Sequence, residues 1–483
     1  MSGMNGMNDV DLKITGRMLL GGVVVNGTVL VNDGRIVSVT RGRGLDGAGD
    51  SAADASGNAI APVDARETIT LADDEVLIPG IVDTHVHINE PGRTEWEGFD
   101  HATRAAAAGG VTTVLDMPLN SNPPTLTVDA LNVKKACAEH KAHTQLGFWG
   151  GVDETNLGTG MLKRLWDEGV FGFKCFLSPS GVDEYGSLAY PKLEAAMREI
   201  ASFGGQLIIH AEDPRELAAH GGHVTDSYRS FADSRPAECE AHAVAQVVEA
   251  VERTGCRTHL LHISCGASLD VIREAKAKGL PITAETCPHY LTIDCDHIPD
   301  GNTAFKCCPP IRSLDEQDAL WAGLVDGTLD FIATDHSPAT AAMKAGGLAK
   351  AWGGVSSLQV GFRAVLTEAK RRGLGLADAV RWMSENTARF AGFHDRGAIA
   401  PGMRADLVVI RPDERFTVHA DELLSRNPIS AFDGRVLDGV ISRTMIGGVT
   451  VHPDDFSEAG DPANLIRRPY TAEEPAPSDS ERF

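Results

Sequence analysis

Side chains that bind metal ions recur where short apolar runs end. In DTHVHINEP, His85 and His87 stand two residues apart, directly after such a run. Residues i and i+2 of a β-strand point to the same side, so the two imidazoles can converge on one ion. A metal ion would use this pair, although the same spacing also arises by chance.

Four further residues hold comparable positions: Lys174 in VFGFKCFL, His210 in QLIIHAE, His262 in THLLHIS and Asp335 in LDFIATDHSP. Each has an ordinary alternative when taken alone. A single histidine is usually a hydrogen-bonded core residue, and Asp335 is well placed to cap a helix. Together with the first pair, they supply nitrogen and oxygen ligands from five different runs. That set favours zinc, with cobalt, manganese and iron as alternatives.

Lys174 is the unusual member because it places an amine in an apolar strand. A protonated lysine beside metal ions would be repelled and costly to bury. A neutral amine can instead add carbon dioxide, and the resulting carbamate is an anion that can bridge two metals. The alternative is a lysine paired with a carboxylate, for example Glu212 or Asp335.

The runs that carry these residues alternate with helical patterns over residues 78–395. Eight strands alternating with helices predict an α/β fold, a (β/α)8 TIM-like barrel. The carboxyl ends of the strands meet at one face of such a barrel, so the polar side chains would share one site. A doubly wound open sheet is the alternative, but no GxGxxG follows the first run, as dinucleotide binding would require.

Both ends of the chain are rich in β-pattern. Residues 8–77 and 396–456 predict one small β-sandwich domain formed from both chain ends. Asn26-Gly27 and Asp33-Gly34 favour tight hairpin turns within it. The segment 457–483 is rich in Pro, Glu and Ser and is predicted to be a mobile tail.

The composition excludes several classes of partner. The chain has 483 residues and a formal net charge of -23, so it would repel nucleic acid and anionic lipid. No apolar run reaches the length of a membrane span, and the N-terminus has no signal-peptide pattern. The nine cysteines include no CxxC pair and are expected to be reduced thiols, as in a cytoplasmic protein.

Longer motifs carry a family resemblance: DTHVHINEPGRTEWEG, AAAAGGVTTVLDMPLNSNPPT, GFKCFLSPSG, HAEDP, TCPHYL, KCCPPIR and ATDHSP. The chain resembles the cyclic amidohydrolases of the amidohydrolase superfamily, and among them the allantoinases most. GAIAPGMRADLVVI near the C-terminus is similar to the small β-sandwich of that superfamily. The resemblance covers roughly residues 10–455.

This resemblance implies two divalent metal ions, zinc first, with these ligands: His85 and His87 at the more buried ion, His210 and His262 at the other, the carboxylated Lys174 between the two ions, and Asp335 at the first ion. A hydroxide bridging the ions would open the cyclic amide, with Asp335 as the catalytic proton shuttle. The implied substrate is the small molecule allantoin, the product is allantoate, and the implied assembly is a homotetramer.

The choice of substrate depends on two departures from related enzymes. Asn89 stands where dihydroorotases have an arginine that binds the substrate carboxylate, and the neutral ureido group of allantoin suits an amide better. Ser178 and Ser180 occupy the loop in which hydantoinases and dihydropyrimidinases place a tyrosine. These enzymes remain the alternatives. A non-catalytic barrel protein with an assembly role is a remote one, because such proteins lose metal ligands and this chain keeps all six.

Six residues are candidates for contacting the substrate: Asn89, Asn120, Ser178, Ser180, His289 and His336. Three of them have structural alternatives. Asn120 precedes two prolines and suits a turn. His289 follows the seventh predicted strand and is equally well explained as a structural residue. His336 is next to Asp335 and could orient that carboxylate instead.

Overall fold

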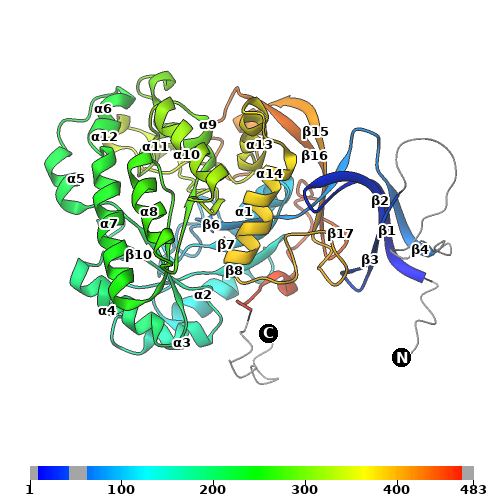
Figure 1. Cartoon of the computed structure of the whole chain (residues 1–483), viewed down its shortest axis with the longest axis horizontal. Helices are drawn as coiled ribbons and strands as arrows, with labels where there is room; N and C mark the ends of the chain where they lie inside the picture. The colour runs from blue at the N-terminus through cyan, green and yellow to red at the C-terminus, as the bar shows by residue number, and fades with distance from the viewer. Residues whose placement is uncertain (1–8, 43–62, 470–483) are drawn as a thin grey trace.

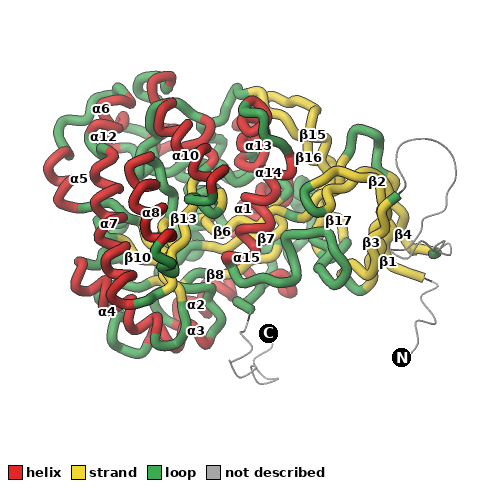
Figure 2. The backbone as a smooth tube through the Cα atoms, in the orientation of Figure 1, coloured by secondary structure: helices red, strands yellow, loops and turns green. Residues whose placement is uncertain are grey.

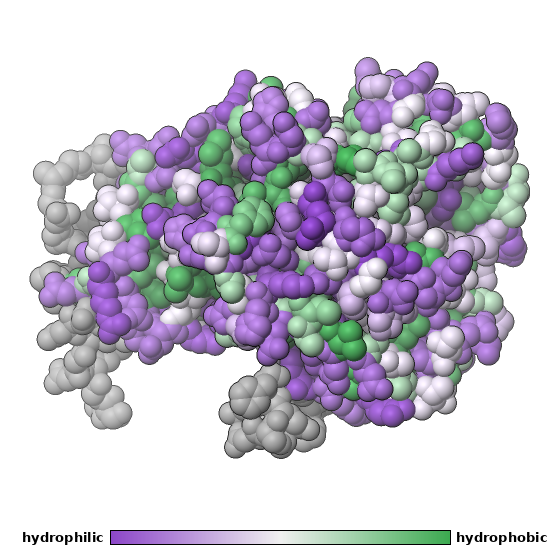
Figure 3. All heavy atoms as spheres, turned by 180° about the vertical axis from the view of Figure 1, so that it is seen from behind, coloured by the Kyte–Doolittle hydropathy of each residue, from purple (hydrophilic) through white to green (hydrophobic). Residues whose placement is uncertain are grey.

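A computed structural model describes residues 9–42 and 63–469 of the chain. A barrel of strands surrounded by helices lies beside a smaller sheet made from both chain ends (Figure 1). Figure 2 shows helices around the barrel and mostly strands and loops in the smaller part. The face seen in Figure 3 is covered mainly by hydrophilic side chains, with scattered hydrophobic patches.

The barrel strands are parallel and follow one another around a closed ring. They are β6 (Ile81–Val86), β7 (Val111–Asp116), β8 (Gln145–Phe148), β9 (Gly150–Gly151), β10 (Phe173–Phe176), β11 (Gln206–His210), β12 (Arg257–Leu260), β13 (Ile282–Thr286) and β14 (Phe331–Ile332). The pairing order is β6-β7-β8 and β9-β10-β11-β12-β13-β14. A bridge between Val86 and His336 joins β6 to the end of β14. The hydrogen bond from Phe171 N to Phe148 O connects β8 to the start of β10, so the predicted (β/α)8 barrel is confirmed.

The strands are short and apolar because helices cover one face and the barrel interior covers the other. Every residue of β6, β7, β10 and β11 is buried. The interior is filled by large side chains, including Trp149, Phe171 and Ile208. A packed interior of this kind leaves room for a ligand only at the ends of the strands.

The outer helices are α1 (Phe99–Ala108), α2 (Val128–Ala138), α3 (Met161–Asp167), α4 (Tyr190–Ala201), α5 (Pro214–His220), α6 (Tyr228–Asp233), α7 (Ala237–Thr254), α8 (Gly266–Ala277), α9 (Pro288–Thr292), α10 (Leu314–Asp326), α11 (Ala341–Lys344), α12 (Gly347–Lys350), α13 (Gly361–Arg371), α14 (Leu376–Val380) and α15 (Asn386–Phe390). In α7, Val244, Val247, Val248 and Val251 form one buried stripe with helical spacing. The helix ends at Gly255, whose φ of 64° is unfavourable for other residues.

Both chain ends contribute strands to one eight-stranded sheet, as predicted. Its members are β1 (Asp9–Leu20), β2 (Val23–Asn32), β3 (Arg35–Arg41), β4 (Asp64–Thr70), β5 (Val76–Pro79), β15 (Leu407–Thr417), β16 (Val436–Ile446) and β17 (Val449–Thr450). Strand β5 pairs with β15, although it precedes β6 by a single residue, Gly80. The apolar run before His85 is therefore two strands in two sheets, where the sequence pattern indicated one.

One of the two predicted hairpin turns is wrong. Asp33 and Gly34 do connect β2 to β3, with φ of 49° and 70°. Asn26 and Gly27, in contrast, lie inside β2. A Cβ atom on Gly27 would lie 2.4 Å from the carbonyl oxygen of Thr40 and 2.9 Å from Sδ of Met18. The glycine is needed for a close approach between strands rather than for a turn.

The C-terminal segment is ordered as far as the structure describes it. Ile466 N donates to Leu146 O, and Arg468 N donates to Gly169 O, so this part of the predicted mobile tail lies along the barrel. Residues 470–483 lie outside the described residues. The predicted limits of the sandwich domain, the barrel and the tail stay predictions. Within residues 9–42 and 63–469, no helix combines the length and apolar character needed to cross a membrane. All nine cysteines are unpaired.

Candidate metal centre and active site

A cavity of about 450 Å³ opens at the carboxyl ends of the barrel strands. Five of the six predicted metal ligands line it: His87, Lys174, His210, His262 and Asp335. His85, the sixth, is fully buried directly beneath them. The barrel thus brings together side chains from β6, β10, β11, β12 and the segment after β14.

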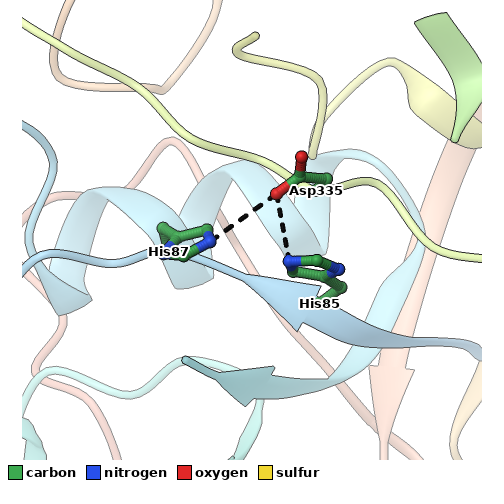
Figure 4. Close-up of side chains that lie close together, drawn as sticks. All are labelled: His85, His87 and Asp335. Carbon is green, nitrogen blue, oxygen red and sulfur yellow. Dashed lines mark ion pairs between the residues drawn. The ribbon is translucent and has the colours of Figure 1, made fainter. Parts of the chain in front are cut away.

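The first group of ligands joins the first and last barrel strands. Nε2 of His85 lies 3.1 Å from Oδ1 of Asp335, and Nε2 of His87 lies 3.6 Å from the same oxygen. Figure 4 shows both imidazoles pointing toward this carboxylate. Burial opposes the ionisation of Asp335, but the histidines around it hold its pKa well below the usual range. The carboxylate is therefore ionised at neutral pH.

Lys174 points into the same space. Its Nζ atom lies 3.3 Å from Nε2 of His85 and 3.5 Å from Nε2 of His87. Among the described residues, no carboxylate lies within 4.0 Å of this amine, and Glu212 pairs with other side chains. Burial lowers the pKa of Lys174 to about 8. The neutral amine is therefore much more accessible near physiological pH than it is for an ordinary lysine.

His210 and His262 form a second group. Nδ1 of His210 lies 3.0 Å from Nε2 of His262. The ring centroids of His262 and His85 are 5.6 Å apart, so the two groups of ligands are adjacent. The opposite nitrogen of His210, Nε2, lies 2.8 Å from Oε2 of Glu212. Glu212 also accepts two hydrogen bonds from Arg235, at 3.0 and 2.6 Å.

A second buried carboxylate holds His85. Oε1 of Glu285 lies 2.5 Å from Nδ1 of His85, and its Oε2 lies 3.1 Å from Nε2 of His259. Burial raises the pKa of Glu285, but the two histidines outweigh it and hold the pKa at about 2. Sequence reasoning missed Glu285, Glu212 and Arg235 as parts of the site. The HAE and ITAET stretches placed both acids at strand ends, which was the available signal.

The backbone is unusual where these side chains emerge. Apart from Asp33 in its turn, the non-glycine residues with positive φ among those described are Asn89 (68°), Asn120 (62°), His262 (40°) and Asp335 (44°). All four follow barrel strands on the side of the cavity. Such conformations cost free energy for a non-glycine residue and cluster at functional sites.

Four of the predicted substrate-binding residues have buried polar atoms without a hydrogen-bond partner among the described residues. These atoms are Oδ1 of Asn89, Oγ of Ser178, both ring nitrogens of His289 and Nε2 of His336. Burial lowers the pKa of His289 to about 4, so its imidazole is neutral at physiological pH. A ring nitrogen of His289 lies within 4.8 Å of a carboxylate oxygen of Asp335.

Asn120, Ser180 and the other ring nitrogen of His336 are already engaged by the protein. Nδ2 of Asn120 lies 3.4 Å from Nδ1 of His87, and the hydroxyl of Ser180 donates to Tyr185 O at 2.6 Å. Both residues also line the cavity. Nδ1 of His336 accepts hydrogen bonds from the backbone N–H groups of Ser357 and Leu358. That contact fixes the loop after β14. Like Asn89, Ser178 and His289, His336 is not among the residues that line the cavity.

The residues present suit a divalent metal ion of borderline character. Four imidazoles and one carboxylate supply nitrogen and oxygen ligands, which zinc and neighbouring metals accept. His85 and His210 each present one ring nitrogen to the site while the other contacts a buried carboxylate. Hydrogen-bonded imidazoles of this kind are typical of metal-bound histidine.

Comparisons with known proteins agree with this architecture. The model of the amidohydrolase family matches residues 76–451. The chain is 52% identical to an allantoinase of Streptomyces avermitilis over 386 residues, which cover 80% of this chain and 86% of that protein. It is 40% identical to an allantoinase of Arabidopsis thaliana, covering 77% of each chain.

The solved structure of an L-hydantoinase (dihydropyrimidinase) from Arthrobacter aurescens superimposes with a TM-score of 0.82 at 27% identity. The match covers 92% of this chain and 96% of that one. The residues matched by the family run from β5, through the whole barrel, to β17 of the eight-stranded sheet. The chain therefore belongs to the amidohydrolase family, whose members are metal-dependent hydrolases.

Proposed function

We propose that the protein hydrolyses a ring amide bond of allantoin and releases allantoate. The observation that carries the chemistry is the convergence of His85, His87 and Asp335 beneath a cavity that Lys174 also lines. The substrate is inferred from allantoinases that match this chain over most of its length, 52% identical in the first case given above. Dihydroorotate and hydantoins are less favoured because the relatives with higher identity are allantoinases.

The proposal includes two divalent ions, zinc first. His85, His87 and Asp335 would hold one ion, His210 and His262 the other. When bound, such ions polarise a carbonyl oxygen and lower the pKa of water to near neutrality. The chain contributes ligands whose orientation is fixed before binding, because both carboxylate contacts to the outer ring nitrogens already exist.

The proposal assigns a carbamate to Lys174. Addition of carbon dioxide requires a neutral amine, and a pKa of about 8 supplies one. The addition would place an anionic group between the two pairs of histidines, where the protein otherwise offers only imidazoles and Asp335. Support comes from the location of Nζ, 3.3 Å from His85 and 3.5 Å from His87, with no carboxylate of the described residues paired to it.

Asp335 is the proposed proton shuttle. Its carboxylate is ionised, faces the cavity and is held between His85 and His87. It can therefore take a proton from the attacking water and pass it to the ring nitrogen that leaves when the amide bond breaks.

Substrate recognition is assigned to neutral polar groups. Oδ1 of Asn89, the hydroxyl of Ser178 and the ring of His289 are buried with unused hydrogen-bonding capacity. These three residues lie outside the cavity lining, which includes the basic side chains of Arg235 and the exposed Lys350. The guanidinium of Arg235 is already bonded to Glu212. The buried neutral groups are the reason for proposing a neutral ring with several N–H and C=O groups as the substrate.

A homotetramer and a cytoplasmic location stay predictions. The family resemblance supports the first. The acidic surface and the nine unpaired cysteines support the second.

The first test is a turnover panel on metal-replete protein with allantoin, dihydroorotate, hydantoin and dihydrouracil. The proposal expects a strong preference for allantoin in kcat/KM. A preference for dihydroorotate would refute the assignment of the substrate and leave the metal chemistry intact. Absence of turnover of all four, with metal bound, would refute the proposed reaction.

A further inference from the structure

Two buried glutamates each contact a histidine in one half of the metal centre, and they do so at different ring nitrogens. Glu285 contacts Nδ1 of His85, which leaves Nε2 facing Asp335 and Lys174. Glu212 contacts Nε2 of His210, which leaves Nδ1 facing Nε2 of His262 at 3.0 Å. A carboxylate accepts a hydrogen bond from the N–H of an imidazole, so each contact selects which nitrogen keeps its lone pair.

The orientation of the His210 ring is fixed by several contacts. Glu212 is fully buried and accepts two further hydrogen bonds from Arg235, in a bidentate pair. Phe176 stacks against the imidazole of His210, with ring centroids 4.8 Å apart and an interplanar angle of 25°. The ring can therefore neither rotate about its long axis nor exchange its two nitrogens without losing these contacts. Arg235 in turn keeps the buried carboxylate ionised and oriented.

We propose that the Glu212–Arg235 pair is the positioning unit for the half of the centre formed by His210 and His262. It aims the Nδ1 lone pair of His210 at the space between these two residues and acts little on the half formed by His85 and His87. This inference rests on the proposed two-ion centre. Neither Glu212 nor Arg235 is assigned to bind metal.

The effect is expected at one ion only because the two glutamates contact different histidines. Within the described residues, Glu212 contacts His210 and Arg235, whereas Glu285 contacts His85 and His259. The two carboxylates share no hydrogen-bond partner. Loss of an outer partner of a metal-bound histidine typically lowers metal affinity by about 10- to 100-fold. We expect that loss at one ion only, a result that general destabilisation would not produce.

The experiment compares wild-type protein with Glu212→Gln and with the matched variant Glu285→Gln. Glu212→Gln leaves the partly buried guanidinium of Arg235 without its carboxylate partner. The double variant Glu212→Gln/Arg235→Gln removes both charges and is the control for a destabilised fold. Zinc stoichiometry is measured after dialysis against a chelator of defined affinity. Anomalous scattering from crystals of each variant locates the remaining ion. Thermal unfolding of the metal-free proteins monitors the fold.

We expect wild-type protein to hold two ions. The Glu212 variants should need about 10- to 100-fold higher free zinc than wild type to load the ion at His210 and His262. Glu285→Gln should weaken the ion at His85 instead. Equal affinity for both ions in wild type and in both Glu212 variants would overturn the positioning role, and so would equal weakening of both ions. Failure of wild-type protein to bind two ions would instead refute the proposed centre itself.

Discussion

Nε2 of His85 lies 3.1 Å from Oδ1 of Asp335, although the two residues come from opposite ends of the barrel sequence. His85 ends the first barrel strand, and Asp335 follows the last. Closure of the ring between β6 and β14 is what makes them neighbours. The catalytic hypothesis depends on this closure.

Removing the charge of Asp335 should abolish most turnover. Asp335→Asn keeps the shape of the side chain but cannot accept a proton, so kcat for allantoin should fall by about 10²- to 10⁴-fold. Steady-state kinetics with parallel metal analysis measures the effect. Asp326→Asn, at the end of α10 and away from the cavity, is the matched control and should retain activity. Near-normal kcat in the metal-loaded Asp335 variant would exclude the shuttle role.

Removing the amine of Lys174 should deplete the metal centre. Lys174→Gln cannot form a carbamate, so both bound metal and activity should fall at least about 10-fold. Elemental analysis of the purified variant measures this loss. In wild-type protein, reloading of the metal-free form should be slower in bicarbonate-free buffer than with added bicarbonate. Full metal content in Lys174→Gln would contradict the bridging role.

Asn89 should affect substrate binding more than stability. Its φ of 68° makes Asn89→Gly the suitable variant, because glycine tolerates this conformation and alanine does not. Loss of one buried hydrogen bond to the substrate should lower kcat/KM by about 10-fold, mainly through KM. Kinetics with allantoin and chemical unfolding check both parts. An unchanged KM would assign Asn89 to the loop backbone instead.

His289 should make metal-free protein less stable in mild acid. Its pKa is lowered to about 4 by burial, below the ordinary value of 6.5. Between these values the unfolded chain binds the proton and the folded protein does not, so stability falls as pH falls from 6.5 toward 4. His289→Phe should reduce the drop in unfolding free energy between pH 7.5 and 5 by about 2 kcal/mol. Chemical unfolding at both pH values tests this, and an equal drop in both proteins would contradict it.

Gly27→Ala should destabilise the eight-stranded sheet formed by the two chain ends without changing the catalytic activity. The added Cβ would approach Thr40 O to 2.4 Å, so the strands must separate, at a cost of about 1–3 kcal/mol. Gly222→Ala is the control, since its Cβ would lie 3.8 Å from the nearest neighbouring atom, His220 O. Unfolding by urea measures the difference. Equal stability of the two variants would mean that β2 and β3 adjust freely.

The sequence predicted the barrel and the set of candidate ligands because both depend on local periodicity. Alternating strands and helices indicated the fold, and the HxH spacing placed His85 and His87 on one side of a strand. It could not show that the apolar run before them divides at Gly80, since one continuous pattern serves two sheets. Nor could it distinguish Asn26-Gly27 within a strand from the same dipeptide in a turn.

The sequence by itself determined which residue types stand at the strand ends, and therefore the class of chemistry. Only the tertiary structure decided which ring nitrogen of each histidine faces the cavity. That choice depends on Glu285 and Glu212, which reach His85 and His210 through contacts that no local pattern encodes. The tertiary structure also decided that Lys174 has no carboxylate partner of the described residues within 4.0 Å and that Glu212 pairs with Arg235. Pairing between distant side chains depends on how the barrel closes, and a closed ring is a property of all its strands together.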